Sequence, residues 1–167
     1  MTIPHRGETG FGTYFITFNI WQKRRLLQSF RSAELFIEIL YNFRSEDRYL
    51  VHEFVVMPNH FHGLLTPLRP NTLERGMGLI KGAFSYQYSR LTRYPGEIWQ
   101  PSFMDRRVRD HQEYERFRTY IHQNPVKARL AATPEEFPHG SASGKHELDE
   151  VPLRLKPVSK AASGTQA

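Results

Sequence analysis

Two β-like runs separated by only two residues constrain the fold of this chain more than any other feature. Tyr49 to Met57 and His60 to Thr66 are rich in β-branched and aromatic residues, and only Pro58-Asn59 lies between them. A connection this short joins antiparallel neighbours, so we expect a β-hairpin. Pro-Asn is not among the favoured two-residue turns, which leaves the geometry of the turn open.

Further strands and helices are predicted on both sides of this hairpin. In order they are a strand at 12–20, a helix at 32–44, a mostly helical stretch at 71–93, a basic strand at 96–109, a helix at 111–122 and a short helix at 125–131. Ser32 and Asp110 are placed to act as N-caps. Asn124 should mark a break because it precedes Pro125. The order β-α-β-β-α-β-α favours an α+β sandwich, an antiparallel sheet with helices packed on one face.

The length and composition indicate one domain with a basic surface. The 167 residues carry a net charge of +6, so an acidic polymer is the expected partner, either nucleic acid or an anionic membrane. No apolar run approaches the roughly 20 residues that span a bilayer, and we expect a cytoplasmic protein without a membrane segment. The chain has no cysteine, which restricts any metal site to His, carboxylate or amide ligands.

A change of composition divides the chain near residue 133. From Pro134 onward Gly, Ser, Pro and Lys are frequent and apolar periodicity is lost. We therefore expect a domain over 1–133, followed by a flexible basic C-terminal tail over 134–167 that is dispensable for folding.

His60-Phe61-His62 is the strongest local motif. Residues i and i+2 of a strand point to the same face about 7 Å apart, so two imidazoles can converge on one ion while Phe61 points into the core. A bare His-x-His pair is also compatible with one turn histidine and one half-buried structural histidine. The pair alone does not decide between these interpretations.

Tyr120 and Asn124 form a second pair. Four residues apart on a helix, they lie on one face and can offer a phenol and an amide oxygen to the same site. The structural alternative is that Tyr120 is a core aromatic and that Asn124 is an N-cap before Pro125.

Basic residues near the predicted strands and helices are candidates for phosphate binding, although a run of charges is often only a solvated face. These candidates are Lys23, Arg24, Arg25, Lys81, Arg106, Arg107, Arg109, Lys127 and Arg129. Glu53 and Asp105, the carboxylates nearest to the motifs, are interpreted as surface or pairing charges and are left out of the site.

Two long motifs in the same order resemble a known family. They are VVMPNHFHGLL at 55–65 and YIHQNPVKARL at 120–130, supported by WQPSF at 99–103 and GTYFIT at 12–17. Together they resemble the REP-associated tyrosine transposases, relatives of the single-tyrosine HUH transposases of insertion sequences. The stretch FPHGS at 137–141 departs from the Trp-Ser-Ser ending expected in that family, so the placement of the carboxyl end is not carried over.

The resemblance implies both a fold and a chemistry. The fold is the HUH endonuclease fold, a ferredoxin-like or RRM-like sandwich. His60, His62 and Asn124 are the implied ligands of Mg²⁺ or Mn²⁺, and Tyr120 is the implied nucleophile. The implied activity is metal-dependent nicking and joining of single-stranded DNA beside hairpins of palindromic REP repeats, through a covalent 5′-phosphotyrosine intermediate, by a monomer or a homodimer.

Three other functions are weighed against this one. A catalytically silent binder of single-stranded or hairpin DNA does not need Tyr120, the two histidines and Asn124 together. A metal-dependent phosphoester hydrolase should show a general base near the metal, and the sequence offers no clear candidate. A ferredoxin-like structural protein is the third possibility.

Overall fold

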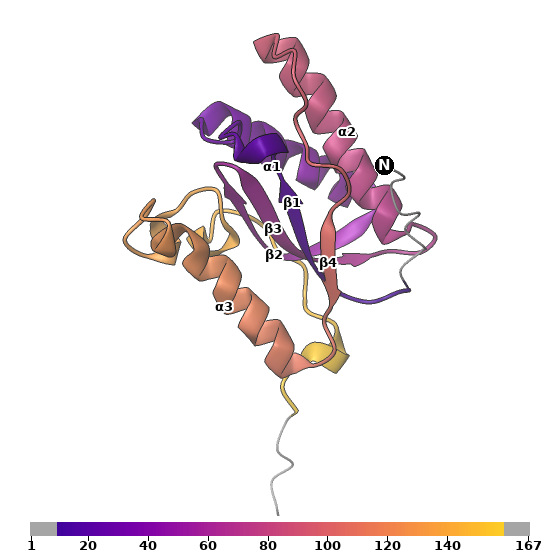
Figure 1. Ribbon diagram of the computed structural model, residues 1–167. Helices are drawn as coiled ribbons and strands as arrows, with labels where there is room; N and C mark the ends of the chain where they lie inside the picture. Colours follow the sequence, from indigo (N-terminus) through magenta and orange to yellow (C-terminus); the bar gives the residue numbers. More distant parts are fainter. Residues whose placement is uncertain (1–9, 159–167) are drawn as a thin grey trace, which may run out of the picture.

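A four-stranded antiparallel sheet forms the centre of the computed structural model, which describes residues 10–158 (Figure 1). The spatial order is β2-β3-β1-β4. The strands are β1 (Tyr14–Asn19), β2 (Tyr49–Met57), β3 (His60–Pro67) and β4 (Met104–Arg107), and the helices are α1 (Phe30–Ser45), α2 (Leu73–Thr92) and α3 (His111–Lys127). Met57 pairs with His60 across Pro58-Asn59, so the predicted hairpin is confirmed.

Both faces of the sheet are covered. Alternate residues of β1 point to opposite sides: Ile16 and Phe18 pack with α1 and α2, whereas Phe15 packs with α3. Figure 1 shows α1 and α2 on one side and α3 on the other. The α+β sandwich is confirmed, but the expectation that the helices share one face is wrong. The sequence GTYFITFNI is consistent with cover on both faces, because apolar and polar residues do not alternate regularly in a strand that is buried on both sides.

The first helix begins earlier than predicted, because Ser29 rather than Ser32 is its N-cap. The Ser29 hydroxyl accepts from the backbone N–H of Ser32 at 3.1 Å. Phe30, the first residue of the helix, is 67% exposed, so it adds nothing to the buried apolar stripe that marks the rest of the helix. Asp110 caps α3 as predicted, since its carboxylate accepts from the backbone N–H of Glu113 at 2.8 Å.

Helix α3 also passes through Pro125, so the expected break at Asn124 is wrong. Proline removes one backbone donor, and here it lies only two residues before the helix ends at Lys127. Pro125 and Ile121 are both buried, and this burial offsets the missing hydrogen bond.

The predicted basic strand at 96–109 shrinks to the four residues of β4. Trp99 makes only an isolated bridge with Ile20. Two residues between Trp99 and β4 interrupt the strand. Ser102 has a φ of 65°, outside the extended region, and Pro101 has no N–H to donate.

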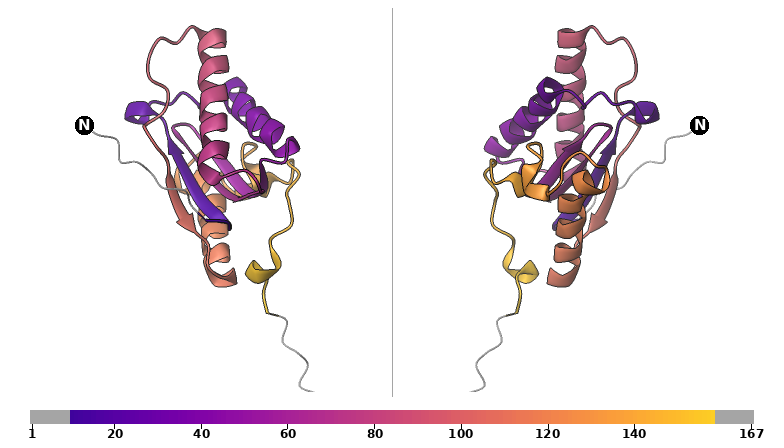
Figure 2. Two further views of the ribbon diagram at one scale, coloured as in Figure 1. Left: turned by 90° about the vertical axis from the view of Figure 1, so that its right-hand side faces the viewer. Right: turned by 90° about the vertical axis from the view of Figure 1, so that its left-hand side faces the viewer.

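The C-terminal segment (134–158) packs on the domain and is not the flexible tail expected from composition (Figure 2). It covers edge strand β2: the backbone N–H of Val56 donates to His139 O at 2.8 Å, and that of Asp149 donates to Val51 O at 2.8 Å. Leu155 is fully buried in the α3-side core. The expected basic character is also wrong, because residues 134–167 contain four Lys or Arg and five Asp or Glu.

The expected tail continues over 159–167, outside the described residues, so that part of the prediction stays open. Within 10–158, none of the helices combines the length and the apolar character needed to cross a bilayer.

Candidate active site

Strand β3 presents His60 and His62 on the face that α3 covers. Phe61 between them is fully buried on the other face, where its ring lies 4.8 Å from that of Phe36. Gly63, two residues after Phe61, leaves room for this ring, because a Cβ at Gly63 would lie 2.8 Å from Phe61 Cζ. The two imidazole centroids are 4.7 Å apart, so the strand alternation brings the rings together as the motif predicts.

Each histidine has its Nδ1 atom engaged by a neighbouring side chain. His60 Nδ1 lies 2.6 Å from Asn59 Oδ1, and because a carbonyl oxygen only accepts, Nδ1 carries the proton. His62 Nδ1 lies 2.8 Å from Thr17 Oγ1, and Thr17 is its directly paired residue in β1. These contacts hold the rings so that both Nε2 atoms are left to bind an ion.

Burial keeps both rings neutral. Desolvation is the main cause that lowers the pKa of His62 to about 3, and repulsion from His60 in its protonated form adds to it. Desolvation also lowers the pKa of His60, although its contact with Asn124 acts in the opposite direction. A neutral imidazole is the form that coordinates a metal, so little proton competition is expected at neutral pH.

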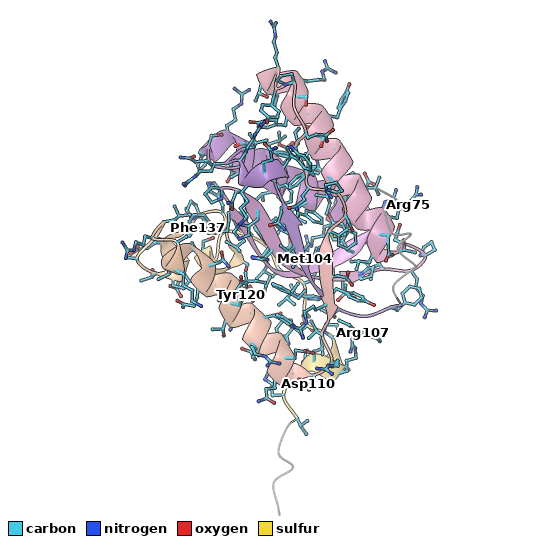
Figure 3. All side chains as sticks on the ribbon, viewed as in Figure 1. Arg75, Met104, Arg107, Asp110, Tyr120 and Phe137 are labelled. Atoms are coloured by element: carbon cyan, nitrogen blue, oxygen red, sulfur yellow. The ribbon has the colours of Figure 1, made fainter. Side chains whose placement is uncertain are left out.

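Helix α3 brings Tyr120 and Asn124 to the same place (Figure 3 labels Tyr120). Tyr120 is 45% exposed, and the centroid of its ring lies 5.2 Å from that of His62 in an edge-to-face arrangement. Asn124 Oδ1 lies 3.3 Å from His60 Nε2. One helix face therefore supplies an accessible phenol and an amide oxygen to the two histidines of the sheet.

The donor set fits a divalent cation. Because His60 donates through Nδ1, its neutral Nε2 has no proton, and two lone pairs face each other across the 3.3 Å to Asn124 Oδ1. A bound cation would relieve this repulsion, and His60 and Asn124 would be two of the residues that hold it. The amide oxygen suits Mg²⁺ and Mn²⁺, and of these two ions the transition metal Mn²⁺ is the better match for imidazole nitrogens. Within 10–158 there is no group of three His, Asp or Glu side chains that could hold a metal, so an amide is the available third ligand.

An aromatic layer that the motifs did not predict supports these residues. Phe15 of β1 stacks on Phe117 of α3 with centroids 4.4 Å apart, and its ring lies 5.2 Å from His62 and 5.9 Å from Tyr120. The Arg106 guanidinium lies 5.7 Å from the Phe117 ring. Phe15 therefore packs beneath both Tyr120 and His62.

Two open cavities flank the histidine pair. One, of about 270 Å³, is lined by Lys23 and Arg25 together with the hairpin tip, His60 and Asn124. The other, also of about 270 Å³, is lined by Thr17 and by the loop at 100–104. The pair thus lies between two hollows, one of which has a basic wall.

Four of the predicted phosphate-binding residues lie close to the site. Lys23 and Arg25 line the first cavity. Lys127 Nζ is 5.9 Å from the Tyr120 ring, and Arg106 lies opposite Phe15 in the sheet register.

The other predicted basic residues have different surroundings. Lys81 donates to the carbonyls of Gln100 and Ser102 at 3.1 and 2.6 Å and lies near Phe18, on the α1 and α2 side of the sheet. Arg24 donates to the Tyr94 hydroxyl. The remaining three are exposed: Arg107 opposite Tyr14, Arg109 paired with Glu113 at 3.5 Å, and Arg129 with a φ of 59° just after α3.

Two further residues lie near the site, although the sequence motifs do not indicate them. Thr17 lies on the histidine face only because β1 pairs with β3, and no local pattern indicates that register. Glu53 was interpreted as a surface or pairing charge. It is a pairing charge, but its side chain is only 8% exposed and binds α3.

In fold, the chain is an α+β sandwich of the HUH endonuclease type, with a histidine pair on the sheet and a tyrosine on the helix that covers it. It belongs to the IS200-like transposase family, whose model matches residues 13–124. Over 83% of the chain it is 26% identical to the REP-associated tyrosine transposase of Escherichia coli K12, of which the match covers 84%. It is also 23% identical to an uncharacterized protein of Haemophilus influenzae, over 74% of this chain and 86% of that protein.

Solved structures support the same fold. A REP-associated tyrosine transposase bound to a REP hairpin aligns with a TM-score of 0.68 at 22% identity, covering 95% of this chain and 96% of that one. A transposase-like protein from Deinococcus radiodurans aligns with a TM-score of 0.52 at 17% identity, covering 77% of this chain and 98% of that one.

Proposed function

We propose that this protein nicks and rejoins single-stranded DNA beside a hairpin of the REP type, with Tyr120 as nucleophile. The observation that carries the proposal is the delivery of two groups by one helix: the Tyr120 ring lies 5.2 Å from His62, and Asn124 Oδ1 lies 3.3 Å from His60. A structural tyrosine would be expected inside the core, yet Tyr120 is 45% exposed, on the helix whose Asn124 lines a basic cavity.

The chemistry follows from the groups present. The Tyr120 phenolic oxygen attacks the scissile phosphorus, a Tyr120 O–P bond forms and the P–O3′ bond breaks. The phenol loses its proton and the departing 3′ oxygen gains one, which leaves a 5′-phosphotyrosine and a free 3′-hydroxyl. This exchange of one phosphodiester for another conserves the bond energy, so rejoining needs no nucleotide cofactor.

His60, His62 and Asn124 would hold a Mg²⁺ or Mn²⁺ ion, which would supply positive charge next to the phosphate that Tyr120 attacks. Thr17 and Asn59 hold the two imidazoles in the orientation that leaves both Nε2 atoms available. Lys23 and Arg25, which line the cavity at His60, and Arg106, which lies at the Phe117 ring, would bind phosphates of the strand.

The substrate is inferred from the family and from the site. A single strand is proposed because the scissile phosphate must reach Tyr120 and the histidine pair together. The related transposase solved with a REP hairpin supports hairpin DNA as the recognised form. Localisation with the DNA in the cytoplasm and action as a monomer or homodimer are part of the same proposal.

The deciding experiment is to trap the covalent intermediate. Incubation with a hairpin that carries a single-stranded 5′ flank, in the presence of Mn²⁺, should give a denaturant-stable protein–DNA adduct, and mass spectrometry should place a 5′-phosphate on Tyr120. An adduct on another residue, a 3′-phosphotyrosine or no adduct would reject the proposal. His60→Ala with the same DNA serves as the control for metal-dependent formation.

A further inference from the structure

Glu53 of β2 is a buried carboxylate to which the proposed chemistry gives no role. Its side chain is 8% exposed on the α3 face of the sheet, where Glu53 pairs with Leu64 of β3. Three side chains donate to it: Arg118 Nε to Oε1 at 2.9 Å, His122 Nε2 to Oε2 at 2.8 Å, and the Ser141 hydroxyl to Oε2. A carboxylate removed from water is tolerated only with such partners.

Two of the donors come from the turn of α3 that carries the site. Arg118 and His122 are four residues apart and therefore on one flank of the helix. Tyr120 lies between them in the sequence but contacts His62 and Phe15 instead. Apolar burial of Tyr114 and Ile121 holds α3 against the sheet but is non-directional. The charge-assisted hydrogen bonds to Glu53 are directional, so they set the rotation and height of the helix.

The third donor comes from the C-terminal segment. Ser141 lies in the short helix η3 (Ser141–Ser143), and its hydroxyl also accepts from the Phe54 N–H at 3.1 Å. Burial raises the pKa of Glu53, but the hydrogen bonds from His122, Ser141 and Arg118 hold it below its ordinary value. The ionised carboxylate thus joins three parts of the fold: β2, the catalytic helix and the C-terminal segment.

We propose that Glu53 is a positioning residue that fixes α3 on the sheet, so that Tyr120 and Asn124 meet the two histidines, and that Ser141 couples the C-terminal segment to this placement. The proposal rests on the proposed nicking function. It assigns the C-terminal segment a part in the reaction, although none of its residues has been placed in the site.

Glu53→Gln tests the proposal because it keeps the size of the side chain and removes the charge. With saturating hairpin DNA and Mn²⁺, the rate of adduct formation should fall roughly 10- to 100-fold, since misplacement by about 1 Å has effects of this order. Affinity for the hairpin should change little, whereas affinity for Mn²⁺ should fall, because Asn124 shifts together with α3. Arg118→Met should slow the reaction as well and add little in the Glu53→Gln background, because both changes break the same contact.

Asp149→Asn is the matched control. Asp149 also anchors the C-terminal segment, but through Arg44 Nε and the Val51 N–H, each at 2.8 Å, and neither lies on α3. The Asp149→Asn substitution should lower the free energy of unfolding and leave the rate of adduct formation near that of the native chain. Equal loss of rate in Asp149→Asn, or a native rate in Glu53→Gln, would show that Glu53 only stabilises the fold and would overturn the proposal.

A measurement independent of activity separates this proposal from the proposed function. The chain has no cysteine, so spin labels can be placed specifically at the exposed positions Thr119→Cys on α3 and Glu38→Cys on α1. The label distance should broaden in Glu53→Gln and stay narrow in Asp149→Asn; equally narrow distances in both would overturn the positioning role. Absence of any adduct with the native chain would reject the nicking function, while the label distances would still decide whether Glu53 positions α3.

Discussion

The Tyr120 ring lies edge-on to the His62 ring, with centroids 5.2 Å apart, although the two residues belong to a helix and a strand far apart in the sequence. Phe15 contacts both rings and fixes the spacing from below. Nearly half of the Tyr120 surface remains accessible next to a neutral imidazole that Thr17 holds, and this supports the nucleophilic role proposed for Tyr120.

Tyr120→Phe should abolish adduct formation while the free energy of unfolding changes by less than about 0.5 kcal/mol, because an exposed hydroxyl is removed without disturbing the helix. Hairpin binding, measured by fluorescence anisotropy, should be retained. Tyr86→Phe is the control, since Tyr86 is also exposed but lies on α2 beside Arg90. A loss of adduct in Tyr86→Phe would contradict the assignment.

Thr17→Val should weaken Mn²⁺ binding about 10- to 100-fold, as is typical when a hydrogen-bond partner of a metal-binding histidine is lost. The substitution keeps the shape of the side chain but removes the oxygen that lies 2.8 Å from His62 Nδ1. Thr17→Ser keeps the oxygen and should bind Mn²⁺ nearly as well as the native chain. Calorimetric titration compares the two, and equal affinities would show that Thr17 does not orient the histidine.

Asn124→Asp and Asn124→Leu distinguish a ligand from a helix residue. A carboxylate at this position should preserve or strengthen Mn²⁺ binding, because it keeps an oxygen at the place of Oδ1, 3.3 Å from His60 Nε2, and adds negative charge. Leucine should weaken binding markedly while leaving α3 helical by circular dichroism. Similar Mn²⁺ affinities for the two variants would remove Asn124 from the metal site.

The attachment of the C-terminal segment should weaken in acid. Hydrogen bonding to Arg44 holds the pKa of Asp149 below its ordinary value of 3.8. The stabilisation is therefore fully present above pH 4 or so and is lost as the pH falls through the lower, folded-state pKa. Thermal unfolding followed from pH 6 to pH 2.5 should show a loss of stability below about pH 4 that is smaller in Asp149→Asn. An identical profile in the two proteins would exclude this contribution.

Most of the fold could be predicted because its signals are local. The hairpin at Pro58-Asn59, the cap at Asp110 and the approximate helix positions follow from short-range patterns. The proximity of Tyr120 to Asn124 and of His60 to His62 also follows from the helix and strand periods. The roles proposed for these four residues stay predictions, although the structure brings them together.

What could not be predicted depends on contacts between distant parts of the chain. The pairing of Thr17 with His62 is set by the register of β1 on β3, and the surroundings of Glu53 are set by the placement of α3. The packing of the C-terminal segment could not be predicted for a related reason. It is held by backbone hydrogen bonds to β2 and by single buried side chains such as Leu155, neither of which produces a periodic pattern.

Two leucines of the C-terminal segment provide a matched test of its attachment. Leu155 is fully buried beside α3, whereas Leu153, two residues earlier in the same short helix η4 (Leu153–Leu155), is 83% exposed. Leu155→Ala should lower the free energy of unfolding by about 2–5 kcal/mol, the usual effect of emptying a core position. Leu153→Ala should change it by no more than about 0.5 kcal/mol. Chemical denaturation measures both, and a Leu155→Ala protein as stable as Leu153→Ala would restore the original expectation of a dispensable tail.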